Sequence, residues 1–248
     1  MSDSAKPTVL ILGGRSDIGQ AIARRFAQGG HPVILAARGS ETLEPDRTDI
    51  ALRHSVDVSL AEFDVLDTKA MAAFAAGFDP LPGIVVSVVG AMGDQGESER
   101  NPEAAALVMR SNYEGPAQIL GLFAERMAAA GGGTLVGVSS VAGDRGRASN
   151  YVYGSAKAGF TAFLSGLRNR LAKQGVHVLT VKPGFVATRM TEGMDTPKPL
   201  TAAPDEVGEA VFRAVERGRD VIYVRPVWAG VMGVIRALPE RVFKKTSL

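Results

Sequence analysis

Short runs of β-branched and other apolar residues alternate along the chain with longer segments whose apolar residues recur at helical spacing. Most of the short runs are apolar at consecutive positions, which is typical of parallel strands covered on both faces. Regular alternation of strands and helices favours right-handed crossovers and a doubly wound sheet. We therefore predict an α/β fold with a seven-stranded parallel sheet and helices on both faces. The predicted strands are 8–12, 32–36, 60–63, 84–89, 134–138, 176–181 and 220–224, and the predicted helices lie near 17–29, 67–77, 102–129, 151–174 and 204–217.

Composition and charge exclude several classes of protein. The 248 residues include 28 Lys and Arg against 26 Asp and Glu, and the net charge of +2 gives no overall attraction to nucleic acid. A hydrophobic share of 46% with 22% charged residues is that of a globular protein rather than a disordered one. The chain has no cysteine and its three histidines are scattered, so we expect neither disulfides nor a metal site.

The beginning of the chain carries no recognisable targeting signal. The apolar run 8–12 ends at Gly13 and is too short for a signal-peptide core. No window offers the ~20 apolar residues of a membrane-spanning helix. We therefore expect a cytoplasmic protein. Because no change of composition divides the chain, we predict one domain over 1–226, followed by a tail at 227–248 that is not a separate domain.

The tail at 227–248 is basic and amphipathic, with four basic side chains against one glutamate from position 236 onward. Its apolar residues at helical spacing are Trp228, Val231, Met232, Ile235 and Leu238. Two interpretations remain open for the face that they share. It caps the domain core or a subunit contact, or it lies on an anionic bilayer as a peripheral contact at the inner face of the membrane.

A glycine-rich turn follows the first predicted strand and leads into the first predicted helix. This is the context of a pyrophosphate site, because the helix N-terminus offers free N–H groups and a positive dipole end to phosphate. Asp17, with Gln20 three residues later, resembles a capping box, and we interpret Asp17 as the helix cap. The alternative for the whole segment is a plain strand-to-helix turn. The candidate cofactor-binding residues here are Gly13, Arg15, Ser16, Asp17, Ile18 and Gly19.

Basic rather than acidic residues stand where the ribose of a dinucleotide meets the second strand. A carboxylate there would bond the 2′-hydroxyl of NAD, whereas a basic residue accepts the 2′-phosphate of NADP. Arg38 ends this strand without a neighbouring acid, and Arg15 can converge with it on one phosphate. We predict NADP(H) in preference to NAD(H), the alternative being that Arg38 is a solvated loop charge. Asp64, beside Val65, either accepts a hydrogen bond from the adenine amino group or caps a turn.

Tyr153 and Lys157 lie one helical turn apart on the same predicted helix face. A phenol with a pKa near 10 exchanges protons poorly at neutral pH, and a neighbouring ammonium lowers that pKa by stabilising the phenolate. Ser140 follows a buried strand, and the carboxyl ends of parallel strands line the ligand crevice. Asn112 adds a polar side chain on the long helix before that strand. These four residues form a candidate catalytic group, although a Tyr–Lys pair alone also fits an ordinary helix surface.

In this order and spacing, the residues resemble the short-chain dehydrogenase/reductase family over nearly the whole chain. The resemblance implies a single-domain Rossmann fold and an NADPH-dependent oxidoreductase that reduces a ketone to a secondary alcohol by hydride transfer. It also implies the role of each candidate catalytic residue. Ser140 would donate a hydrogen bond to the ketone oxygen, and Tyr153 would deliver the proton. Lys157 would bond the nicotinamide ribose, and Asn112 would anchor a water that relays protons.

The resemblance extends the cofactor site beyond the glycine turn. In the family motif after the sixth strand, Val186 and Thr188 hold the nicotinamide carboxamide. The sequence departs from the family where Asp17 replaces the middle glycine of the turn, and where Ser87-Val-Val-Gly90 stands in place of Asn-Asn-Ala-Gly. The further cofactor-binding residues that the resemblance implies are Gly90, Pro183, Gly184, Val186 and Thr188, with Tyr153 and Lys157.

Several stretches resemble more closely the bacterial members of the family that reduce a polyprenylphosphoryl 2-keto-pentose. These stretches are 12–19, 63–67, 139–147 and 235–245. The resemblance implies a keto-sugar, free or lipid-linked, as the substrate. Arg145, Arg147 and Arg189 flank the expected substrate mouth and suit a phosphate, the alternative being solvated loop charges. We interpret residues 189–203 as a mobile substrate lid.

A non-catalytic protein that binds NADP(H), as a regulator or as the partner of an enzyme, could use the same fold. Such a protein has no need for Ser140, Tyr153 and Lys157 together, and their co-occurrence favours the enzyme. The helices predicted at 102–129 and 151–174 are long enough to build the interface of a homodimer or homotetramer.

Overall fold

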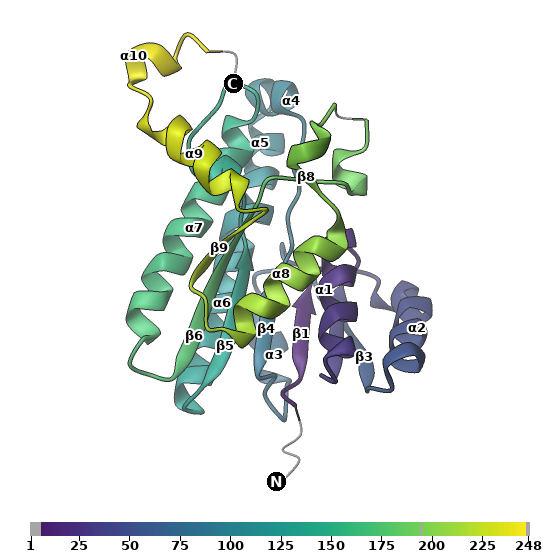
Figure 1. Ribbon diagram of the computed structural model, residues 1–248. Coiled ribbons are helices and arrows are strands. Elements are labelled where there is room, and N and C mark those ends of the chain that lie inside the picture. Colours follow the sequence, from purple (N-terminus) through teal and green to yellow (C-terminus); the bar gives the residue numbers. More distant parts are fainter. Residues whose placement is uncertain (1–5, 194, 247–248) are drawn as a thin grey trace.

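The computed structural model describes residues 6–193 and 195–246, and all seven predicted strands enter one parallel sheet (Figure 1). The sheet order β3-β2-β1-β4-β5-β6-β9 reverses direction beside β1, which in doubly wound folds marks the ligand crevice. The fold class predicted from the sequence is therefore confirmed. The strands are β1 (Val9–Leu12), β2 (Val33–Ala37), β3 (Val58–Glu62), β4 (Ile84–Ser87), β5 (Gly133–Val138), β6 (Val176–Pro183) and β9 (Val221–Val224).

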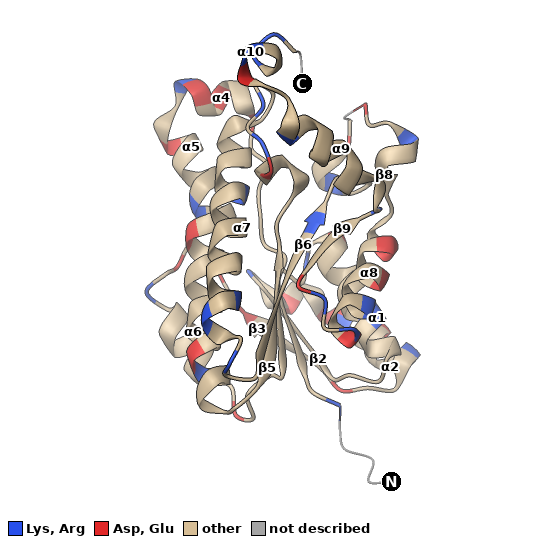
Figure 2. Ribbon diagram, turned by 60° about the vertical axis from the view of Figure 1, so that its left-hand side comes forward, with Lys and Arg blue, Asp and Glu red and all other residues tan. Residues whose placement is uncertain are grey.

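Helices cover both faces of the sheet, and the sheet seen nearly edge-on separates them into two layers (Figure 2). Apolar side chains of β1, β2 and β4 pack under α1, α2 and α8 on one face, and other residues of the same strands pack under α3, α6 and α7 on the other. The first layer consists of α1 (Asp17–Gln28), α2 (Glu44–His54) and α8 (Pro204–Glu216), and the second of α3 (Met71–Ala76), α6 (Gly115–Ala129) and α7 (Tyr151–Leu171).

The predicted helix at 102–129 is interrupted. It consists of α5 (Pro102–Met109), a π-helical turn at Arg110–Glu114 and α6. A π-helical turn inside a helix frequently marks a functional site, and this one places Asn112 in the interior with no exposed surface. The sequence also failed to predict α2 and a short helix, α4 (Gln95–Arg100).

The segment interpreted as a lid contains regular structure. A short strand just before it, β7 (Phe185–Val186), pairs in parallel with a short strand near its end, β8 (Thr201–Ala202). Between them lie single helical turns at Arg189–Thr191 and Lys198–Leu200. Met194 of this segment lies outside the described residues, as do 1–5 of the predicted domain and 247–248 of the tail. The motion of the segment stays a prediction.

The tail forms α9 (Val227–Ala237) and α10 (Glu240–Phe243), and its apolar face packs inward. Trp228, Met232 and Ile235 are buried in a cluster with Val141. The indole Nε1 of Trp228 donates to the Leu200 carbonyl at 3.0 Å. Of the two interpretations left open, packing of this face against the domain is therefore the one observed, and contact of the tail with a membrane stays a prediction. Among the described residues, none of the helices combines the length and the apolar character needed to span a membrane.

Candidate active site

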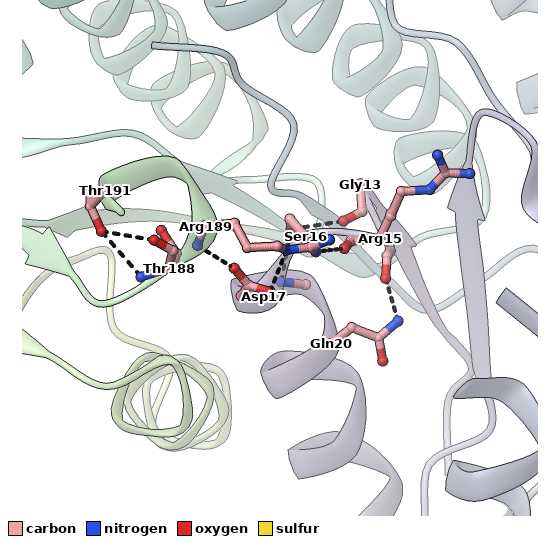
Figure 3. Close-up of polar contacts among 10 residues, drawn as sticks. Gly13, Arg15, Ser16, Asp17, Gln20, Thr188, Arg189 and Thr191 are labelled. Atoms are coloured by element: carbon pink, nitrogen blue, oxygen red, sulfur yellow. Dashed lines mark hydrogen bonds and ion pairs between the residues drawn. The ribbon is translucent and has the colours of Figure 1, made fainter. Parts of the chain in front are cut away.

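The glycine turn joins β1 to α1 at the carboxyl edge of the sheet (Figure 3). Gly13 has a φ of +97°, which favours glycine, and a Cβ on Gly19 would lie only 2.4 Å from the Gly13 carbonyl oxygen. The Ser16 hydroxyl accepts from the Gly19 N–H at 3.0 Å and donates to the Gly13 carbonyl at 2.8 Å. The start of α1, with its free N–H groups, thereby borders the cleft as a phosphate site requires.

Asp17 is the first residue of α1 rather than its cap, so our interpretation of Asp17 as the capping residue is wrong; Ser16 holds that position. The Asp17 carboxylate instead accepts from Arg189, from its backbone N–H at 2.8 Å and from its Nε at 3.0 Å. Arg189 Nη2 also donates to the Arg15 carbonyl at 2.6 Å. These contacts, visible in Figure 3, tie the beginning of the segment 189–203 to the glycine turn.

A cleft of about 450 Å³ extends from the glycine turn along the ends of the neighbouring strands, and Arg15 and Arg38 both line it. Arg15 Nη2 donates to the Thr42 hydroxyl at 2.8 Å and to the Gly39 carbonyl at 3.0 Å, so it holds the loop after β2. The Arg38 side chain is exposed and has no hydrogen bond or ion pair with the rest of the described chain. The Arg38 guanidinium is therefore available to a ligand, whereas Arg15 already uses its Nη2 within the chain.

Asp64 and Val65 line the same cleft. The Asp64 Oδ1 accepts from the Leu66 N–H at 2.9 Å, which is the turn-capping arrangement that the sequence left open. Its second oxygen leaves an acceptor for a ligand, so the cap and the predicted adenine contact are compatible.

Asn112, Ser140, Tyr153 and Lys157 come together around a second cavity of about 130 Å³. Ser140 follows β5, and its hydroxyl oxygen accepts from the Ala142 N–H at 3.1 Å, which leaves the hydroxyl proton free to be donated. Tyr153 and Lys157 extend from the first two turns of α7. The Lys157 Nζ donates to the Val138 carbonyl at 3.0 Å and lies 5.8 Å from the centre of the Tyr153 ring.

The Asn112 amide is held in the interior by two hydrogen bonds. Its Nδ2 donates to the Ala91 carbonyl at 2.6 Å and to the Val108 carbonyl at 2.8 Å. Its Oδ1 is buried and has no partner among the described residues. A Cβ on Gly90 would lie 2.5 Å from that oxygen and 3.4 Å from the Lys157 Nζ. Both groups therefore border Gly90, and an acceptor and a donor so placed suit a shared water.

Burial affects the protonation of Tyr153 and Lys157. It lowers the pKa of the Lys157 ammonium to about 8, because the charged form loses its hydration. Burial likewise raises the pKa of the Tyr153 phenol, and the hydrogen bond from Ser140 offsets part of that increase. The prediction that Lys157 lowers the pKa of Tyr153 is wrong in this structure, where Ser140 is the group that stabilises the phenolate. At neutral pH the phenol is protonated and the ammonium is charged.

The two cavities form one continuous cleft, because they share several lining residues. All of the predicted cofactor-binding residues line one or both cavities except Gly19, which lies beneath the turn. A phosphate-binding turn at one end and a polar catalytic group at the other fit an extended dinucleotide. The residues common to both cavities are Ile18, Val88, Gly90, Thr188 and Met190.

The three arginines predicted to meet the substrate lie in different places. Arg147 lines the catalytic cavity, whereas Arg189 lines the cofactor end of the cleft. Arg145 lines neither: it donates to the Leu238 carbonyl at 2.6 Å and pairs with Glu240 at 2.9 Å. The predicted substrate role of Arg145 is therefore wrong, because its guanidinium holds the tail against the domain.

Sequence reasoning missed Trp228 as a part of the site. This single tryptophan reaches the catalytic cavity from α9 and packs edge-on against Phe185, with the ring centres 5.7 Å apart. The helical spacing of the apolar residues around Trp228 indicated that this face of the tail is buried. It did not indicate which part of the domain the face packs against. Asn150, at the start of α7, also lines the cavity, and no local pattern pointed to it.

Comparison with known proteins identifies the family of the chain. A family model described as short chain dehydrogenase matches residues 7–198. An uncharacterized oxidoreductase of Mycobacterium tuberculosis is 39% identical over 249 residues, which cover 99% of each chain. A short-chain dehydrogenase from Sphingobium yanoikuyae in complex with NADPH has a TM-score of 0.82 at 24% identity, covering 95% of this chain and 97% of its own. A 3-oxoacyl-[acyl-carrier protein] reductase from Brucella melitensis in complex with NAD has a TM-score of 0.78 at 25% identity, covering 90% and 97%.

These relatives do not show the finer resemblance to polyprenylphosphoryl keto-pentose reductases, which stays a prediction. Membership of the family is shown, because the family model spans most of the chain. The sheet order, the glycine turn and the candidate catalytic group also occur together in the structure. The chain belongs to the short-chain dehydrogenase/reductase family of NAD(P)-dependent oxidoreductases.

Proposed function

We propose that the protein uses NADPH to reduce a ketone to a secondary alcohol, with Tyr153 as the proton donor. The observation that carries the proposal is the meeting of Ser140, Tyr153 and Lys157 in one small cavity that continues into the cofactor cleft. A protein that only senses the cofactor requires the cleft and not this group of side chains. When bound, NADPH supplies the hydride.

The side chains of this cavity divide the remaining work. Negative charge develops on the ketone oxygen during reduction, and the Ser140 hydroxyl, turning from the Tyr153 oxygen to the ketone oxygen, stabilises it by a hydrogen bond. The Tyr153 phenol, kept protonated by burial, transfers its proton to the same oxygen. Lys157 and the unpartnered Asn112 Oδ1, which border Gly90, provide the route by which a water returns a proton to the phenol.

The first experiment is a rate measurement on the purified full-length protein. Consumption of NADPH and of NADH is followed with a panel of ketones that includes free and polyprenyl-phosphate-linked keto-sugars. We expect turnover with at least one ketone, faster with NADPH. Tight binding of NADPH without turnover across the panel would support the regulatory protein instead.

Arg38 provides a test of the cofactor preference. Because its guanidinium is available at the ribose end of the cleft, we expect Arg38→Ala to raise the KM for NADPH by about tenfold to a hundredfold, the value of a charge-assisted hydrogen bond. The KM for NADH should change little, because NADH has no 2′-phosphate. The matched control is Arg53→Ala on α2, an exposed arginine outside the cleft. Equal increases for both cofactors would overturn the assignment.

The pKa of Lys157 predicts how kcat/KM for ketone reduction changes at alkaline pH. With a pKa of about 8 in the folded protein, the ammonium is charged below that pH and loses its charge above it. We therefore expect kcat/KM for ketone reduction to fall by about tenfold per unit of pH above roughly pH 8. In Lys157→Arg the guanidinium does not titrate, so this decline should disappear even though the rate is lower. A wild-type profile that stays level to about pH 10 would contradict the prediction.

A further inference from the structure

Arg147 lies in the loop between Ser140 and α7, and its side chain lines the catalytic cavity together with Ser140 and Tyr153. The backbone of this loop is fixed, since the Asn150 N–H donates to the Arg147 carbonyl at 3.1 Å. The position therefore brings a cation into the space where the proposed ketone is reduced.

The Arg147 guanidinium makes no hydrogen bond with the part of the chain that the structure describes. Its Nε is buried without a hydrogen bond, and no ion pair to Arg147 exists within residues 6–193 and 195–246. Other partly buried arginines differ in this respect: Arg145 is bound to the tail, and Arg168 donates to the Val178 carbonyl at 2.8 Å. Burial lowers the pKa of Arg147, which reflects the cost of holding an unpaired charge there.

The cavity contains no counter-charge. Its lining residues include Arg147 and Lys157 but no aspartate or glutamate of the described chain. Asp144, three residues before Arg147, does not pair with it. The Asp144 carboxylate accepts instead from Lys182 at 2.5 Å and from the Tyr223 hydroxyl at 2.7 Å. An arginine remains protonated under all ordinary conditions, so an anion from outside the chain would supply the counter-charge that the described lining lacks.

The phosphates of the cofactor are not that anion. The glycine turn, Arg15 and Arg38 line the other end of the cleft, and Arg147 does not reach it. Arg147 borders only the catalytic cavity, where the substrate would meet the nicotinamide end of the cofactor.

We propose that Arg147 binds an anionic oxygen group of the substrate, a carboxylate or a phosphate ester, and so selects ketones that carry such a group. This inference rests on the proposed ketone reduction. The guanidinium presents parallel N–H donors that match two oxygens of either group. Because Arg147 lines the same small cavity as Ser140 and Tyr153, the anionic group would lie within a few bonds of the reacting carbon.

The kinetic test compares pairs of related ketones in which one member carries the anionic group and the other is uncharged. The pairs are pyruvate with methyl pyruvate, 4-oxopentanoate with its methyl ester, and dihydroxyacetone phosphate with dihydroxyacetone. We expect the wild-type kcat/KM to favour the anionic member of at least one pair by about tenfold to a hundredfold. The carboxylate and phosphate pairs distinguish the two sources of the anion, and their lengths bound its distance from the carbonyl.

The variants then assign the preference to Arg147. In Arg147→Gln the ratio between anionic and neutral members should fall toward one, and Arg147→Lys should keep a part of it because the charge remains. A wild-type preference for the neutral member of every pair, or a ratio unchanged in Arg147→Gln, would overturn the proposal.

A second measurement does not depend on turnover. Trp228 is the single tryptophan of the chain and lines the same cavity, so its fluorescence reports binding there. With saturating NADP⁺ present, inorganic phosphate or acetate should give a saturable change in the wild type, a much weaker one in Arg147→Gln, and uncharged acetamide none. Saturation with equal affinity in Arg147→Gln would refute the site. If no ketone is reduced, the proposed function fails while this titration still decides the anion site.

Discussion

Replacing Tyr153 with phenylalanine should lower kcat for ketone reduction by about 10²–10⁴-fold, the usual contribution of a positioned general acid. The phenol oxygen is the only atom removed, and it is the atom that delivers the proton in the proposed reaction. Because burial keeps the phenol protonated at neutral pH, the loss should be seen across the physiological range rather than only at one extreme. Stopped-flow or steady-state rates with saturating ketone measure it directly.

The matched control for this experiment is Tyr151→Phe. Tyr151 lies two residues earlier on α7, but its side chain is 46% exposed and it does not line the cavity. It should keep nearly full activity. NADPH affinity should stay within a few-fold of the wild type in both variants, because the glycine turn and Arg38 are distant from either ring. If Tyr153→Phe retained more than about a tenth of the wild-type kcat, another group would be the proton donor.

The parts of the fold that the sequence predicted correctly are those whose signal is local. Strands such as Val9–Leu12 and Ile84–Ser87 are buried along their full length, so consecutive apolar residues reveal them. The helix α2 was missed because Ile50 is its single fully buried residue, which leaves no apolar stripe to detect. The break before α6 was missed because a π-helical turn hardly disturbs the apolar periodicity on either side.

The parts of the site that the sequence could not predict depend on contacts between distant segments. Asp17 pairs with Arg189, which is 172 residues away in the sequence, and Arg145 pairs with Glu240, which is 95 residues away. In each case the local pattern showed a charged residue, and only the folded chain shows which charge it meets. The catalytic residues are different, since the order of strands in a parallel sheet brings the ends of β4 and β5 and the start of α7 to one edge.

A buried ion pair between Asp144 and Lys182 lies beside this edge of the sheet. Its loss should have the largest effect on the stability of the protein. Asp144 follows the turn after Ser140, and Lys182 comes immediately before the motif at 183–188. Their side chains are only 3% and 9% exposed and meet at 2.5 Å. The Tyr223 hydroxyl donates to the second Asp144 oxygen at 2.7 Å, and burial together with this bond raises the pKa of Tyr223 to about 12. The carboxylate is thus bound from both sides.

Removing one member of such a pair leaves the charge of the other buried without a partner. We expect Lys182→Met or Asp144→Asn to lower the free energy of unfolding by about 3–5 kcal/mol, which for a chain of this length corresponds to a decrease in Tm of roughly 6–20 °C. Urea unfolding and thermal melts of the purified variants measure both quantities. The contrast is Asp49→Asn, which breaks an exposed pair with Arg53 and should cost at most about 1 kcal/mol.

The double variant distinguishes a charge effect from a simple loss of packing. When both Asp144 and Lys182 are replaced by the neutral residues, no uncompensated charge remains, so the double variant should be more stable than the sum of the two single losses predicts. A coupling free energy of about 2 kcal/mol or more would show that the interaction between the two side chains accounts for the loss of stability. Strict additivity would mean that each side chain acts through its own contacts. In that case the link between the Ser140 loop and the 183–188 motif is packing rather than charge.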